Sequence, residues 1–208
     1  MSIVKLNNKA VSNATAFGSI SSLGSMVFIK KLTASSSSTL SFVDGASSVV
    51  LDNTYKEYVF IFNNVHASAG GVSVYLQFQG STNSGSSYGV NITSTYFDAN
   101  HEENDGSSSL SYQTAFDLAQ STSFQSIATL LGGDNDNGTC GILHLFNPSS
   151  TTFAKHFTCT MNHAAASDES KNSYIAGYFN TTSAIDAIQF KLSTNNLQSG
   201  DICLYGIA

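Results

Sequence analysis

Apolar and polar residues alternate one by one along much of this chain, and a period of two is typical of half-buried β-strands. Three segments show the alternation, and in each the apolar side chains share one face. They are residues 71–80 with Val72, Val74, Leu76 and Phe78; residues 152–163 with Phe153, Phe157, Cys159 and Met161; and residues 187–193 with Ile188, Phe190 and Leu192. We expect antiparallel strands with an apolar inner face.

Gly, Ser, Asn and Asp fill the breaks between these runs, and the whole chain contains a single proline. These residues favour turns, because Gly adopts positive φ and the others bond back to their own backbone. Three further runs, residues 58–62, 141–146 and 201–207, are apolar on both faces, as in central or covered strands. The pattern predicts an all-β, antiparallel, jelly-roll-like β-sandwich.

The last ten residues, SGDICLYGIA, end the chain inside an apolar run. We interpret Ser199 and Gly200 as a turn, and Ile202 and Leu204 as the core face of a final strand. The opposite face, with Cys203, Tyr205 and Ile207, then requires cover from a loop, from the N-terminal region or from another subunit, and the latter two are favoured.

Residues 121–133 are compatible with two structures. Phe124, Ile127, Ala128 and Leu131 have helical spacing behind serines that can cap a helix, but the same residues suit a strand. A short helix and a strand remain equally open, and neither changes the fold class.

The chain divides near residue 36, after four consecutive serines. We predict that residues 1–36 form an N-terminal arm that docks on a neighbour, with the serines as a flexible joint, and that residues 37–208 form the sandwich. The alternative is that residues 1–36 supply edge strands of the same sandwich, since residues 26–32 look like a true strand.

The composition excludes several partners. All eight basic residues are lysine and the net charge is −6, whereas nucleic-acid binding requires clustered Lys and Arg, so we expect no nucleic-acid partner. No apolar run is long enough to span a bilayer, so we expect no membrane insertion. The first residues lack the layout of a secretory signal, which predicts a chain that folds where it is made.

No cysteine or histidine pattern predicts a metal site. Cys140, Cys159 and Cys203 are odd in number and lie in apolar runs, so we interpret them as unpaired packing residues, with a Cys pair as the minor alternative. The five histidines, which share no ligand spacing, are His66, His101, His144, His156 and His163.

The segment DNDNG at residues 134–138 resembles the opening of a calcium loop, which requires a glutamate twelve positions along. That position is Leu145, so a turn is the favoured interpretation, and calcium bound by separate loops stays open. We expect no metal and no cofactor.

The segment HEEND at residues 101–105 lacks the second histidine of the zinc-protease signature. Glu102 and Glu103 are candidates to pair with Asp98 or Asp117 as glycosidase carboxylates, but a solvated acidic loop is favoured. We therefore predict no catalytic residue, and ligand-binding residues remain unknown. Six tyrosines are expected in loops and on outward faces, where they suit sugar rings or protein contacts: Tyr75, Tyr88, Tyr96, Tyr112, Tyr174 and Tyr178.

Residues 147–157, 180–192 and 199–207, together with residues 1–8, resemble small virion or tail-fibre-like structural proteins of marine bacteriophages, including phages of cyanobacteria. The likeness extends along nearly the whole chain and includes no catalytic motif. It implies an all-β, jelly-roll-like, oligomeric protein of the virion.

The leading hypothesis is therefore a non-enzymatic virion structural protein that assembles in the host cytoplasm as a homo-oligomer, with a trimer favoured. Residues 1–36 would anchor it to other virion proteins. The sandwich would serve as capsid decoration, or as a tail-fibre or receptor-binding head for host attachment. The alternatives are a carbohydrate-binding module for host-surface glycans and, with less support, a glycan-degrading enzyme.

Overall fold

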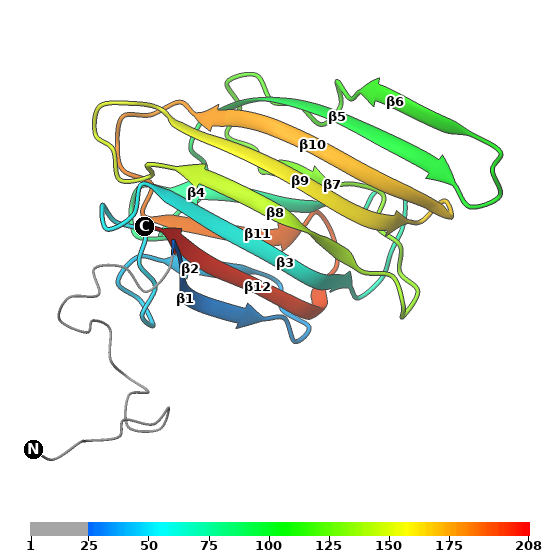
Figure 1. Ribbon diagram of the computed structural model, residues 1–208, viewed down its shortest axis with the longest axis horizontal. Helices are drawn as coiled ribbons and strands as arrows, with labels where there is room; N and C mark the ends of the chain where they lie inside the picture. Colours follow the sequence, from blue (N-terminus) through cyan, green and yellow to red (C-terminus); the bar gives the residue numbers. More distant parts are fainter. Residues whose placement is uncertain (1–24) are drawn as a thin grey trace, which may run out of the picture.

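The computed structural model describes residues 25–208, and these residues form β-strands and no helix (Figure 1). None of them therefore forms a helix that could cross a membrane. The expected all-β fold is confirmed. The strands are β1 Met26–Thr33, β2 Leu40–Val43, β3 Glu57–Ala67, β4 Leu76–Ser81, β5 Ile92–Glu102, β6 Ser108–Tyr112, β7 Gln125–Ala128, β8 Thr139–Phe146, β9 Lys155–Ala165, β10 Glu169–Phe179, β11 Ala187–Leu192 and β12 Leu197–Ile207.

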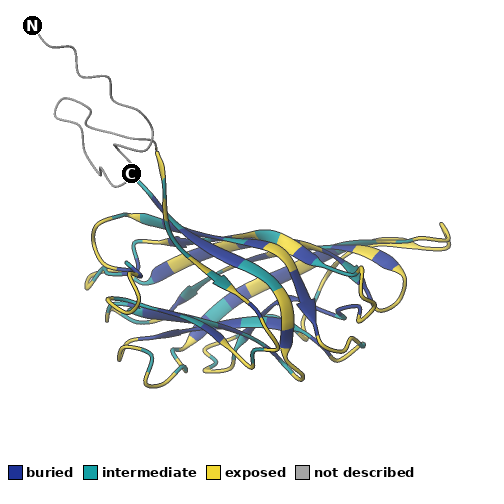
Figure 2. Cartoon of the chain, turned by 90° about the horizontal axis from the view of Figure 1, so that it is seen from below, coloured by how far each residue is buried: buried dark blue, intermediate teal, exposed yellow. Residues whose placement is uncertain are grey.

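The strands form two antiparallel sheets. The large sheet has eight strands in the order β1-β12-β3-β8-β9-β10-β5-β6, and the small sheet has four in the order β2-β11-β4-β7. Figure 2 shows the sheets stacked as two layers. The predicted β-sandwich is therefore confirmed, while the finer jelly-roll-like connectivity stays a prediction.

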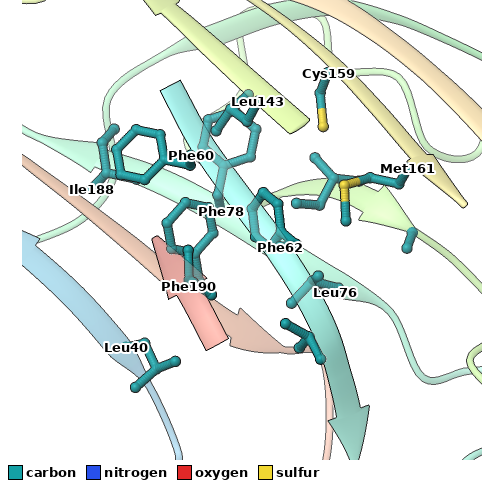
Figure 3. Packing of buried hydrophobic residues seen from close by; sticks show 14 of the residues in the cluster. Leu40, Phe60, Phe62, Leu76, Phe78, Leu143, Cys159, Met161, Ile188 and Phe190 are labelled. Carbon is teal, nitrogen blue, oxygen red and sulfur yellow. The ribbon is translucent and has the colours of Figure 1, made fainter. Parts of the chain in front are cut away.

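Phenylalanine rings that meet edge to face fill the space between the two sheets (Figure 3). The Phe190 ring of the small sheet has its centre 5.3 Å from the centre of Phe60 and 5.1 Å from that of Phe62. The Phe78 ring, also of the small sheet, lies 5.0 Å from Phe157. All five side chains are buried. These contacts attach the small sheet to the large one.

The alternating segments form strands with the predicted inner faces. The buried side chains include Val74, Leu76 and Phe78 before and in β4, Phe157, Cys159 and Met161 in β9, and Ile188, Phe190 and Leu192 in β11. Two residues differ from the prediction, because Val72 and Phe153 precede their strands and are exposed.

The runs that are apolar on both faces belong to β3, β8 and β12, which are all interior strands of the large sheet. In β12, Ile202 and Leu204 lie in the core as expected. On the other face Cys203 is buried, and the Tyr205 ring contacts the Phe28 ring of β1 at 5.5 Å. β1 therefore flanks this end of the chain, and Tyr205 and Ile207 are half-buried.

The expected turn at Ser199 and Gly200 is wrong. Both residues lie inside β12, where the pairing with β3 shifts register on either side of Ser199. Gly200 has φ of 101°, and a Cβ at this position would lie 2.3 Å from the carbonyl oxygen of Asn64. Only glycine fits there. A glycine in the sequence is therefore compatible with a β-bulge as well as with a turn.

The ambiguous segment 121–133 contains strand β7, and no helix forms in it. Ser126 and Ile127 are buried, as is the rest of the strand, which pairs with β4. A fully buried four-residue strand carries no period-two signal, which explains why its sequence was equally compatible with a helix.

Within the predicted arm, residues 26–33 form β1, the edge strand of the large sheet, and pair with β12. Two of the four serines that follow are bonded to β12: the Ser36 and Ser37 amides donate to carbonyl oxygens of Gln198 and Leu197. This part of the chain has the structure that the alternative interpretation described. Residues 1–24 of the predicted arm lie outside the described residues.

Replacing Phe190 by Ala should strongly destabilise the sandwich, because the ring contacts both sheets. Removal of a buried Phe costs roughly 3–5 kcal/mol of unfolding free energy. Urea denaturation followed by circular dichroism measures it. The matched control is Phe153→Ala, at a ring that is 68% exposed, where we expect nearly no change. Equal effects of the two substitutions would contradict this description of the core.

Candidate functional site

Asp98, one of the predicted glycosidase carboxylates, is buried on the inner face of β5 rather than exposed in a cleft. Its carboxylate lies 3.1 Å from the Lys171 ammonium of β10. It also accepts a hydrogen bond of 2.9 Å from the Gln113 amide. Asp98 therefore serves as the partner of a buried cation.

Glu169 and His163 border the same ion pair. Glu169 lies 3.7 Å from the Lys171 ammonium and accepts a hydrogen bond from Asn100. Burial raises the pKa of Glu169, but hydrogen bonds and the nearby Lys171 outweigh it, so the pKa is below its usual value. A general acid requires a shift in the opposite direction. We call Asp98, Glu169 and Lys171 the buried ion cluster.

The other predicted carboxylates are not brought together with Asp98 around one reaction centre. Glu102 and Glu103 line a hollow of about 360 Å³ at the β5–β6 and β9–β10 turns, together with Glu169. Asp117 lies apart, after β6, and accepts a hydrogen bond of 2.6 Å from the Tyr112 hydroxyl. In HEEND, His101 contacts Asp105 at 3.0 Å within the exposed turn.

The DNDNG segment forms a turn in which the Asn137 amide donates to the Asp134 carbonyl oxygen. The carbonyl oxygen of Asn137 in turn contacts His66 Nδ1 at 2.6 Å. Leu145, at the twelfth position, is buried in β8. Within residues 25–208 no three His, Cys, Asp or Glu side chains gather as a metal site would require.

The remaining histidines and cysteines have structural surroundings. His144 lies on the outer face of the large sheet and contacts the Glu57 carboxylate at 2.5 Å. All three cysteines are free. Cys159 and Cys203 are buried, whereas Cys140 is exposed and exchanges hydrogen bonds with Asn64.

The tyrosines are distributed less uniformly than expected. Tyr96 was predicted to face outward but is fully buried, and its hydroxyl donates to Ser173 at 2.7 Å. Burial raises the pKa of Tyr96 to about 12. Tyr112 and Tyr174 are exposed on the large sheet, and Tyr88 lines a polar hollow between loops.

The outer face of the large sheet, which points away from the small sheet, carries a row of mostly apolar residues that is interrupted by Thr160. The strand registers place these residues side by side across seven strands: Cys203, Ile61, Ile142, Thr160, Tyr174, Phe97 and Tyr112. We call them the outer row. The Phe97 and Tyr174 rings are stacked, with centres 5.0 Å apart and planes within 13°.

Among the outer-row residues only Cys203 is buried, and Ile142 and Phe97 are each 40% exposed. A hollow of about 410 Å³ lies beside the outer row, over β8 and β9, with Ile142, His144 and Asn172 in its lining. Sequence reasoning noticed that residues 141–146 are apolar on both faces, but the row becomes visible only once the strand order is known.

Comparisons with protein-family models, with curated proteins and with solved structures found no match to this chain.

The buried His163 should make stability depend on pH. Burial lowers the pKa of His163 to about 4 from 6.5. Its Nε2 donates to the Thr129 carbonyl oxygen at 2.6 Å, and its Nδ1 has no hydrogen-bond partner among residues 25–208. Between pH 6.5 and 4 the unfolded chain therefore binds more protons than the folded chain. Stability is complete above pH 6.5 and falls towards pH 4, by about 3 kcal/mol from this residue.

Denaturant titrations at a series of pH values measure this dependence. A His163→Gln variant should lose much less stability between pH 6.5 and 4 than the parent chain. The control His101→Gln, at an exposed histidine, should retain the parent's dependence. If His163→Gln shows the same dependence as the parent, protonation of His163 does not limit stability.

Proposed function

We propose that this chain is a non-enzymatic structural protein of a bacteriophage virion that acts as a homo-oligomer. In this proposal the N-terminal region attaches it to other virion proteins, and the sandwich is displayed as capsid decoration or as a fibre or receptor-binding head. The resemblance of residues 147–157, 180–192 and 199–207 to phage structural proteins supports the context. The oligomer is proposed to be a trimer.

The outer row is the observation that supports this proposal most. Contiguous exposed apolar residues on a folded domain mark contacts with other proteins. Phe97, Tyr112 and Tyr174 are aromatic residues of the kind enriched in protein interfaces. The low charge of the chain also favours assembly, because copies placed side by side repel one another weakly.

The location of the protein on the particle tests the proposal directly. Antibodies against the purified chain, applied to intact phage particles and viewed by electron microscopy, should label regular positions on the capsid or the tail. Particles without label would overturn the proposal. Light scattering of the purified protein should give a multiple of the chain mass of 22.0 kDa, with three chains expected for a trimer and six where two trimers associate.

A carbohydrate-binding module is a second candidate, favoured by one hollow of about 320 Å³ between the β4–β5 and β10–β11 connections. Its lining combines the Tyr88 ring with the Asn91 and Asn180 amides and includes no charged side chain. An aromatic face and neutral hydrogen-bonding groups are suited to a sugar ring.

Tyr88→Ala should abolish binding to a glycan array if this hollow holds a sugar, because the ring supplies the stacking surface. The matched control is Tyr174→Ala on the outer row, which should leave glycan binding unchanged. Absence of any bound glycan on the array, or equal binding by Tyr88→Ala and the parent chain, would remove this candidate.

A further inference from the structure

Strand β6, Ser108–Tyr112, is the edge of the large sheet, and all five of its residues are exposed. Figure 1 shows the turn between β5 and β6 extending beyond the neighbouring strands at the right of the view. Leu110 is 72% exposed and Tyr112 is 51% exposed, so this edge carries apolar side chains without cover from residues 25–208.

The backbone of β6 has hydrogen-bonding groups that point away from β5. The Glu102 amide bonds the Ser107 carbonyl oxygen, and the Gln113 amide bonds the Tyr96 carbonyl oxygen. Antiparallel pairs alternate between bonded and non-bonded positions. The N–H and C=O groups of Ser108, Leu110 and Tyr112 therefore face outward, ready to pair with a further strand.

The two edge strands of the large sheet, β1 and β6, differ in how well they are protected against pairing with a further strand. β1 carries Lys30 and Lys31 next to a register shift, and charges and bulges are features by which natural edge strands avoid pairing. Residues 108–112 read SSLSY, with no charge and no proline. The unprotected edge is thus β6.

We propose that β6 pairs antiparallel with β6 of a second copy of this chain, with Leu110 opposite the partner's Leu110. Ser108 then faces the partner's Tyr112, and the three facing pairs form about six backbone hydrogen bonds. The two sheets become one, and on the outer face Leu110 packs against the partner's Leu110 while Tyr112 lies opposite the partner's Ser108.

Charge favours this antiparallel arrangement over a parallel one. The β5–β6 turn carries Glu103 and Asp105, with Glu102 beside it. A parallel pair would place the acidic turns of both copies together. In the antiparallel pair they lie at opposite ends of the contact, separated by roughly 17 Å, the length of a five-residue strand.

This inference rests on the proposed function, in which the chain forms a homo-oligomer. It adds one specific contact between the copies. The contact has twofold symmetry, so it joins copies in pairs or joins two trimers whose subunits meet through another surface. Failure of the particle labelling would overturn the virion role and leave the β6 contact standing.

Leu110→Pro tests the contact in the full-length protein. Proline removes an N–H that β5 does not use, so edge pairing is blocked while the fold is retained. Sedimentation velocity over a wide concentration range should show the mass of the largest species halved, with an unchanged thermal midpoint. Met26→Pro, at an outward-facing position of β1, is the control and should keep the parent mass.

Cross-linking tests the register. In a Cys140→Ser background, Leu110→Cys should form a disulfide-linked dimer on oxidation, because Cα atoms of such facing pairs lie about 5.5 Å apart. Ser109→Cys should not, since Ser109 faces the partner's Ser111. A monomeric parent chain, an unchanged mass for Leu110→Pro, a mass halved by Met26→Pro, or no Leu110→Cys dimer would each overturn the proposal.

Discussion

The edge-to-face packing of phenylalanines between the sheets is the contact on which this fold depends. Phe190 and Phe78 project from the small sheet into rings of β3, β9 and β10. The two layers approach closely at Gly80, where a Cβ would lie 2.9 Å from the Phe179 ring. The small sheet has four strands and the large sheet has eight. The ring contacts therefore also determine which part of the inner face of the large sheet the small sheet covers.

The strands were predictable from the sequence wherever one face is apolar, as at Phe157 and Cys159 of β9. Strand order was not, because pairing depends on contacts far apart in sequence. β5 shows the limit most clearly: Phe97 and Ala99 point outward, whereas Asp98 and Asn100 lie on the inner face. Ile92 and Tyr96 share the inner face with Asp98, so both faces of this strand carry apolar residues and periodicity alone does not orient it. The ion pair of Asp98 with Lys171 of β10 is a contact that no local pattern connects to β5.

The buried ion cluster specifies how β5 and β10 pair. Asp98 and Lys171 come from neighbouring strands of the large sheet, and other polar side chains of β9 and β10, including His163 and Ser173, are also buried. A slip of one residue would turn Asp98 to the outer face and leave Lys171 buried without its counter-charge. An unpaired buried charge strongly destabilises the fold, so the ion pair favours one register between β5 and β10, although the pair itself contributes little net stability. Asp98, one of the predicted glycosidase carboxylates, therefore has a structural explanation.

The same pairing creates the outer row. With Asp98 turned inward, Phe97 must point outward, and it meets Tyr174 of β10 and Tyr112 of β6 across the sheet. Inverting β5 would remove the aromatic part of the row and bury it where the ion cluster now lies. An outward Phe97 exposes apolar surface to water at a cost of roughly 25 cal/mol per Å². A partner on that face would recover this cost. The buried ion cluster and the outer row both follow from the register in which β5 pairs with β10.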